Sequence, residues 1–162
     1  MLTEDTESKL KEAFLKYYSK NTGAYLWLQD FRGLCHGIDD LVDIPERRND
    51  AAFFGGVCNQ FVEVLSSDFY VTNRAKLYSM VKSCLHQFFL SVKWENSDLE
   101  WQQTYADIVR CCYNNVIAAV TEIVVLEETG SIKSAYEAAQ EIYALAVCKS
   151  YQTHHTVDGK PI

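Results

Sequence analysis

The sequence has little glycine or proline and no excess of positive charge. Only 7 of its 162 residues are Gly and 2 are Pro, whereas 48% are hydrophobic and 13% are aromatic. Disordered and collagen-like chains have the opposite balance. The 15 Lys and Arg residues are outnumbered by 22 Asp and Glu residues, which gives a net charge of −7. We therefore expect a globular domain with no general attraction to nucleic acid.

Long apolar runs and paired cysteine motifs are missing as well. The most apolar stretch, residues 116–126, contains Thr121 and Glu122 and is shorter than the roughly 20 residues that cross a bilayer. The first ten residues are polar and acidic, unlike a signal peptide. None of the six cysteines belongs to a CxxC pair, and most have apolar neighbours. These features predict a cytoplasmic protein without a membrane span, whose cysteines are reduced core residues.

Apolar residues recur with the helical period, and no two alternating runs are joined by an Asn-Gly or Asp-Gly turn. We expect an all-α fold, with one bundle of about six helices over residues 1–150 and a polar tail over residues 151–162. The expected helices cover residues 4–20, 24–42, 50–66, 73–93, 97–128 and 132–150. Ser97 would begin the fifth helix with a capping box, and Gly130 would end it. Gly55 and Gly56 inside the third helix predict close contact with another helix, because each costs about 1 kcal/mol relative to Ala.

The second expected helix ends in a run of acidic residues. Asp39, Asp40 and Asp43 lie within five positions, and Asp39 and Asp43 share one polar stripe. The three carboxylates repel one another, and the negative end of the helix dipole makes each less favourable by about 0.3–1 kcal/mol. A bound cation would reverse this penalty, and Mg²⁺ binds one or two carboxylates together with substrate phosphates. Arg47 and Arg48 follow, as candidate contacts for phosphate oxygens.

The string Asp39-Asp40-Leu41-Val42-Asp43 resembles the DDxxD metal motif of class I isoprenoid (terpenoid) synthases, and it is especially similar to the form in squalene and phytoene synthases. This resemblance implies an isoprenoid-synthase-like helical fold. In that family the aspartates hold Mg²⁺ ions that bind a prenyl diphosphate and trigger the loss of pyrophosphate. If this chain is an enzyme, the resemblance implies a prenyl diphosphate lyase or transferase.

The family's second metal site lies on a later helix, where Asn or Asp is followed by Ser or Thr four residues on and by Glu four residues further. Asn114, Ala118 and Glu122 have these spacings, with Ala118 in place of the hydroxyl residue. Asn115 shares a helix face with Glu122 and is an alternative ligand. The resemblance makes Arg110, one turn before Asn114, a candidate diphosphate contact; the alternative is an ion pair with Asp107.

Two functions follow from these features. The first is Mg²⁺-dependent binding or processing of a small-molecule prenyl diphosphate by a minimal isoprenoid-synthase-like protein. The alternative is a non-catalytic helical interaction protein, including a homodimer, in which the acidic run is an ordinary solvated surface. The marks of the alternative would be an exposed apolar patch and carboxylates that do not converge.

Overall fold

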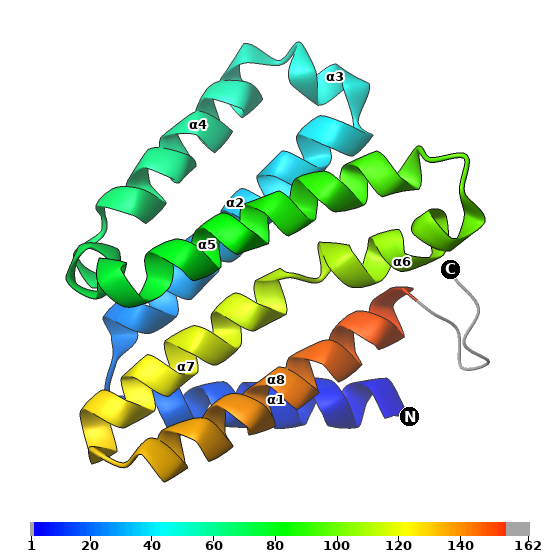
Figure 1. Cartoon of the computed structure of the whole chain (residues 1–162). Helices are drawn as coiled ribbons and strands as arrows, with labels where there is room; N and C mark the ends of the chain where they lie inside the picture. The colour runs from blue at the N-terminus through cyan, green and yellow to red at the C-terminus, as the bar shows by residue number, and fades with distance from the viewer. Residues whose placement is uncertain (1, 155–162) are drawn as a thin grey trace. The chain divides into compact units, whose positions relative to one another are not determined.

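The structure is a computed structural model that describes residues 2–154, with side chains described for residues 5–150. The all-α prediction is confirmed for these residues, which contain helices and short connections and no strand. Along the described chain the helices are α1 (Leu2–Tyr18), α2 (Thr22–Asp43), α3 (Pro45–Arg48), α4 (Ala51–Ser66), α5 (Asp68–Glu95), α6 (Glu100–Arg110), α7 (Tyr113–Thr129) and α8 (Ile132–His154) (Figure 1).

These helices form two compact units, where the sequence predicts one domain over residues 1–150. Unit 1 contains the described residues up to Lys20 and those from Ser79 onward, and unit 2 contains Asn21–Tyr78. The boundary falls inside α5, so each unit receives part of this helix. Each unit has buried side chains of its own.

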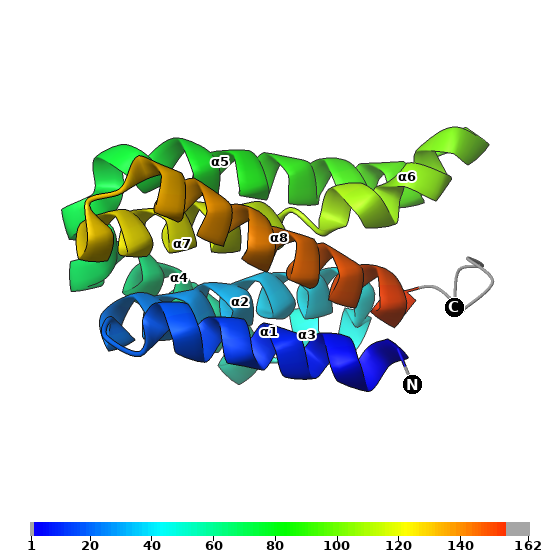
Figure 2. The same ribbon diagram turned by 90° about the horizontal axis from the view of Figure 1, so that it is seen from below.

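Unit 1 is built on the packing of α7 against α8, with α1 in contact with both helices (Figures 1 and 2). The buried face of α8 consists mostly of alanines, and these small side chains allow the larger aliphatic residues of α7 to approach closely. A buried polar contact lies within this packing: the hydroxyl oxygens of Tyr18 and Thr121 are 2.6 Å apart. Thr121 donates its single hydroxyl hydrogen to the carbonyl of Ile117 at 2.8 Å, so Tyr18 is the donor to Thr121.

Unit 2 is organised around Trp27 of α2, which is 1% exposed. Its indole N–H donates to the carbonyl of Val64 in α4 at 2.9 Å, and its ring stacks on Tyr70 of α5. A close approach of α4 to α2 also depends on Gly37, where an added Cβ would lie 2.8 Å from a methyl group of Val57. Unit 2 therefore fixes the buried side of α4 against α2.

Several expected helix limits are wrong. The expected helix over residues 97–128 is interrupted at Cys111 and Cys112. This break and the additional short helix α3 give the described residues eight helices rather than the expected six. The segment after Asp43, expected to be a loop, contains the short helix α3, and α5 begins five residues before the expected start. The expected tail begins inside α8, which continues to His154; residues 155–162 lie outside the described part.

The two predicted helix signals near α6 and α7 have different outcomes. Gly130 ends α7 as predicted, with a φ of 66° that is accessible to glycine at little cost. The capping box at Ser97 is wrong, because the residue before α6 is Leu99. Ser97 instead accepts a hydrogen bond from the backbone N–H of Leu99 at 3.1 Å and donates to Gln102 at 2.5 Å. This arrangement stabilises the turn that precedes α6.

The segment Glu100–Thr129, which comprises α6 and α7, is long and apolar enough to cross a membrane by length and composition alone. Half of its most apolar window is buried within the structure. Buried helices of other proteins pass the same test, so the predicted lack of a membrane span stays a prediction.

Candidate functional site

The acidic run predicted to bind Mg²⁺ forms the C-terminal end of α2. Asp39 and Asp40 are half-buried and Asp43 is exposed. The last turn of α2 contains no basic residue, and the backbone N–H of Ile44 bonds to the carbonyl of Asp40 at 2.9 Å. The negative end of the helix dipole and the three carboxylates therefore lie together, as the sequence predicts.

A positive charge from the chain itself lies at this end of α2. Arg48 of α3 donates from Nε to the carbonyl of Leu41 at 2.6 Å and from Nη2 to the carbonyl of Val42. The guanidinium thus satisfies two carbonyl oxygens of the last turn and opposes the dipole. Arg47 lies over the ring of Phe53, with its Cζ atom 4.4 Å from the ring centroid. Arg47 and Arg48, two of the three predicted diphosphate contacts, are therefore engaged within unit 2.

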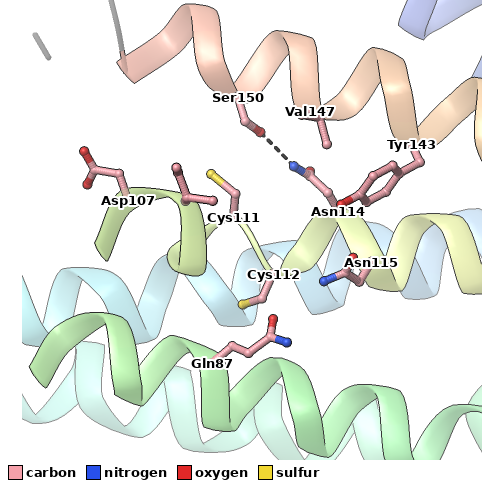
Figure 3. A pocket seen from close by; sticks show the side chains of 10 residues that line it. Gln87, Asp107, Cys111, Cys112, Asn114, Asn115, Tyr143, Val147 and Ser150 are labelled. Carbon is pink, nitrogen blue, oxygen red and sulfur yellow. Dashed lines mark hydrogen bonds between the residues drawn. The ribbon is translucent and has the colours of Figure 1, made fainter. Parts of the chain in front are cut away.

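The residues predicted for the second metal site lie on α7 in unit 1 and differ in burial. Asn114 is buried, and its side-chain amide donates to the hydroxyl of Ser150 in α8 at 3.1 Å (Figure 3). Asn115 is half-buried, and Glu122 is exposed. The buried hydroxyl residue of this helix is Thr121, next to Glu122, and it is used in the contact with Tyr18. The amide of Asn114 is therefore engaged by α8, whereas Glu122 is exposed to solvent.

Arg110, the third predicted diphosphate contact, lies in a structural cluster at the end of α6. Its Nη2 atom is 2.5 Å from a carboxylate oxygen of Glu95, the last residue of α5. Its Nε atom donates to the buried hydroxyl of Ser91 at 3.1 Å, and the guanidinium lies near the ring of Phe88. Arg110 thus joins the C-terminal ends of α5 and α6.

No group of three or more His, Cys, Asp or Glu side chains among the described residues is arranged to hold a metal ion. Asp39, Asp40 and Asp43 belong to unit 2, whereas Asn114, Asn115 and Glu122 belong to unit 1. A magnesium site that combines the two sets stays a prediction.

Unit 1 contains a cavity of about 150 Å³ beside the break between α6 and α7. Its lining is mainly apolar and includes Ile108, Tyr143 and Val147. The two consecutive cysteines at the break point to opposite sides: Cys111 points toward α8 and Cys112 toward α5 (Figure 3). Burial raises the pKa of the Cys111 thiol. The cavity therefore gives access to two thiols in different surroundings.

An exposed apolar surface lies on α4, and the sequence analysis did not identify it. We call it the α4 seam; it consists of Ala51, Phe54, Cys58, Phe61 and Leu65. The side chains of Phe54, Phe61 and Leu65 are 50%, 40% and 36% exposed, and the adjacent Val62 is 61% exposed. The buried residues of α4 are Val57 and Val64, on the side that packs against α2. Thus α4 has two adjacent apolar faces, and only one of them is buried.

The α4 seam has a signal in the sequence that could have revealed it. Its members are separated by three, four, three and four residues, which is the spacing of the a and d positions in a coiled-coil heptad. The only charged residue of α4 is Glu63, which lies outside the seam. Such a sequence is too apolar for a helix with only one buried face.

The six cysteines are free thiols, as predicted, but they are not all core residues. Cys84 and Cys112 are buried, whereas Cys58 and Cys148 are exposed. The exposed position of Cys58 follows from its place in the α4 seam.

The resemblance to isoprenoid synthases rests on the string at residues 39–43 and on the order of the helices. The finer prediction of an isoprenoid-synthase-like fold stays a prediction. Comparisons of this chain with protein-family profiles, with curated proteins and with solved structures found no match.

Proposed function

We propose that this chain is a non-catalytic helical interaction protein that forms a homodimer through the α4 seam. The observation that supports this function is the row of exposed apolar side chains at heptad spacing on α4. Knobs-into-holes packing against a second helix would remove these side chains from water. Isolated apolar residues are common on protein surfaces, but a continuous apolar row marks an interaction site.

A second copy of the same helix fits the seam when the two helices run antiparallel. With the twofold axis between Asn59 and Gln60, Phe54 of one copy lies opposite Leu65 of the other, and Cys58 lies opposite Phe61. Each layer then combines a larger with a smaller side chain, which favours close packing. Charged residues beside a coiled-coil seam select partners by ion pairing. The neighbouring positions of α4 include Gly55 and Val62 and carry no charge, so no like charges at these positions oppose self-association.

The expected dimer is weak. The exposed parts of the apolar side chains offer roughly 300 Å² per copy, and two copies fall below the roughly 1,200–2,000 Å² that standard interfaces bury. We therefore expect a dissociation constant in the micromolar range. A dimer of this strength exchanges with monomer and depends on the concentration of the chain.

The test is to change Phe61 to Glu and to measure the molar mass in solution by light scattering after size-exclusion chromatography. A phenylalanine side chain has roughly 200 Å² of surface, so its exposed 40% contributes about 2 kcal/mol when buried, at ~25 cal/mol per Å². The twofold symmetry doubles the loss to about 4 kcal/mol, which weakens the dimer close to a thousandfold. The variant is expected to be monomeric at concentrations where the wild type is a dimer.

The matched control is Asn59→Glu, which places the same charge on the same helix outside the seam. Asn59 is exposed, so this variant should keep most of the dimer. Circular dichroism at 222 nm should show the same helix content in all three proteins. A wild type that stays monomeric up to about 100 μM, equivalent to about −5.5 kcal/mol, would rule out the proposal, and so would equal effects of the two substitutions.

The magnesium and diphosphate hypothesis has less support in the geometry. Its three arginines already make contacts within the chain, and its oxygen ligands come from two units. Its test is the joint melting experiment described in the Discussion.

A further inference from the structure

Two buried thiols of unit 1 lie in contact at the break between α6 and α7. The Sγ atoms of Cys84 in α5 and Cys112 are 3.2 Å apart. The Sγ atom of Cys112 is also 3.2 Å from the carbonyl oxygen of Cys84. A disulfide bond is about 2.05 Å long, so the sulfur atoms need to approach by little more than 1 Å.

We propose that Cys84 and Cys112 form a reversible intramolecular disulfide when unit 1 reacts with a small-molecule disulfide. Cys112 lines the cavity of unit 1, through which a small reagent can reach it. Cys111 points toward Ser150 on the other side and takes no part (Figure 3). The site is independent of the α4 seam, which belongs to unit 2.

The chemistry is thiol–disulfide exchange in two steps. The thiolate of Cys112 attacks one sulfur of the reagent RSSR, so a mixed disulfide forms and RS⁻ leaves. The thiolate of Cys84 then attacks the Sγ atom of Cys112, and the second RS⁻ leaves. The two protein thiols lose two hydrogens and two electrons, and the reagent gains them as two RSH molecules.

The surroundings of the pair keep it reduced in the absence of such a reagent. The hydrogen bond with Cys84, together with burial, raises the pKa of the Cys112 thiol. Since the thiolate is the nucleophile, the first step is slow at neutral pH. The reaction therefore requires prolonged exposure to a reagent that enters the cavity.

The bond would link α5 to the start of α7 and close a loop between residues 28 positions apart. Such a link restricts the unfolded chain more than the folded chain. It would also hold the break between α6 and α7 against α5. The oxidised protein should therefore melt several degrees above the reduced protein.

The experiment uses the full chain with Cys58→Ser and Cys148→Ser, which remove the two exposed thiols. Incubation with cystamine should give a protein that has lost two hydrogens by intact mass, with the peptides of Cys84 and Cys112 joined. Dithiothreitol should restore the mass and lower the melting temperature again. Adding Cys111→Ser should leave the result unchanged.

Adding Cys84→Ser should block the internal bond and leave one cysteamine group attached to Cys112 as a mixed disulfide. The proposal is overturned if the folded chain keeps all its thiol hydrogens after prolonged incubation. It is also overturned if Cys111, rather than Cys84, is joined to Cys112. Circular dichroism at 222 nm on each variant shows whether the helices have formed, and Cys111→Ser provides a folded comparison if Cys84→Ser does not fold.

Discussion

Replacing Arg110 by Met should destabilise unit 1, because this side chain joins the ends of α5 and α6. Methionine keeps an unbranched apolar stem like that of arginine but lacks the guanidinium. Glu95 then loses a partner at 2.5 Å, and the buried hydroxyl of Ser91 loses a donor at 3.1 Å. The ion pair is only partly screened, since the side chains of Arg110 and Glu95 are 17% and 33% exposed.

The size of the effect follows from these contacts. A hydrogen bond that involves a charged group contributes about 1.5–3 kcal/mol, and both bonds of Arg110 are of this kind. Partial exposure of Glu95 and Arg110 reduces these values, so we expect a total loss of about 2–3 kcal/mol. For a chain of this length, that loss lowers the melting temperature by about 4–12 °C. Glu95→Gln keeps a hydrogen-bond acceptor and should cost about 1 kcal/mol.

The assay is urea denaturation followed by circular dichroism and by tryptophan fluorescence. Trp94 and Trp101 lie in unit 1 with ring centroids 5.4 Å apart, whereas Trp27 lies in unit 2, so two of the three tryptophans report on the unit that contains the substitution. The matched control is Lys133→Met, which removes a basic side chain that is 84% exposed and should change stability by less than about 0.5 kcal/mol. If Arg110→Met is as stable as this control and instead removes a response to diphosphate, Arg110 binds ligand and the structural role is wrong.

Three further predictions concern the ligand hypothesis, the glycines and the buried polar contact. Because the predicted phosphate contacts are engaged by the chain itself, Mg²⁺ and pyrophosphate added together should not raise the melting temperature; a joint rise of several degrees that Asp39→Ala abolishes would instead establish the magnesium site. Thermal melts should show that Gly130→Ala destabilises the protein by about 1 kcal/mol, because residue 130 has a φ of 66°. Gly56→Ala should stabilise the protein by about 0.5–1 kcal/mol, since an added Cβ meets no atom within 4 Å. The opposite signs would contradict the backbone geometry. Burial raises the pKa of the Tyr18 hydroxyl. The protonated hydroxyl therefore contributes its full stability below the unfolded pKa of about 10, and the free energy of unfolding falls as pH rises above that value. Tyr18→Phe should lower the free energy of unfolding by about 1 kcal/mol at pH 7 through the lost bond to Thr121, and in urea titrations at alkaline pH its stability should fall less than that of the wild type.

Local sequence signals predict those features of the fold that have local causes. Apolar periodicity predicts the helices, and Gly130 predicts the end of α7. The start of α5 also has a local cause, because the hydroxyl of Ser67 accepts a hydrogen bond from the backbone N–H of Tyr70. This serine is a signal for a helix start five residues before the expected one.

The break between α6 and α7 has no comparable local signal. Residues 108–115 around the break contain neither glycine nor proline, and Cys111 and Cys112 are both compatible with a continuous helix. The contacts around the break join segments far apart in the sequence: Arg110 bonds to Glu95, and Cys112 contacts Cys84. Helical periodicity does not contain such contacts, so it predicts one long helix.

The candidate site shows the same division between local and tertiary causes. Sequence spacing places Asp39 and Asp43 on one face of α2, but it does not reveal whether a side chain or a metal supplies the opposing charge. The α4 seam is visible as a heptad, yet its exposure depends on which face of α4 packs against α2. Val57 and Val64 are the buried residues of α4, so their face packs against α2 and the seam remains on the exposed side.

An acidic helix end implies a metal only after the chain's own cations have been assigned. Arg48 already directs Nε and Nη2 at the carbonyls of Leu41 and Val42. For Arg48 to bind a diphosphate with the same two groups, both hydrogen bonds would have to break, at a cost of about 1–3 kcal/mol in total. That cost weakens binding by about fivefold to more than a hundredfold. Mg²⁺ held by Asp39 and Asp43 would have to compensate for this loss, and for that reason magnesium and pyrophosphate must be tested together.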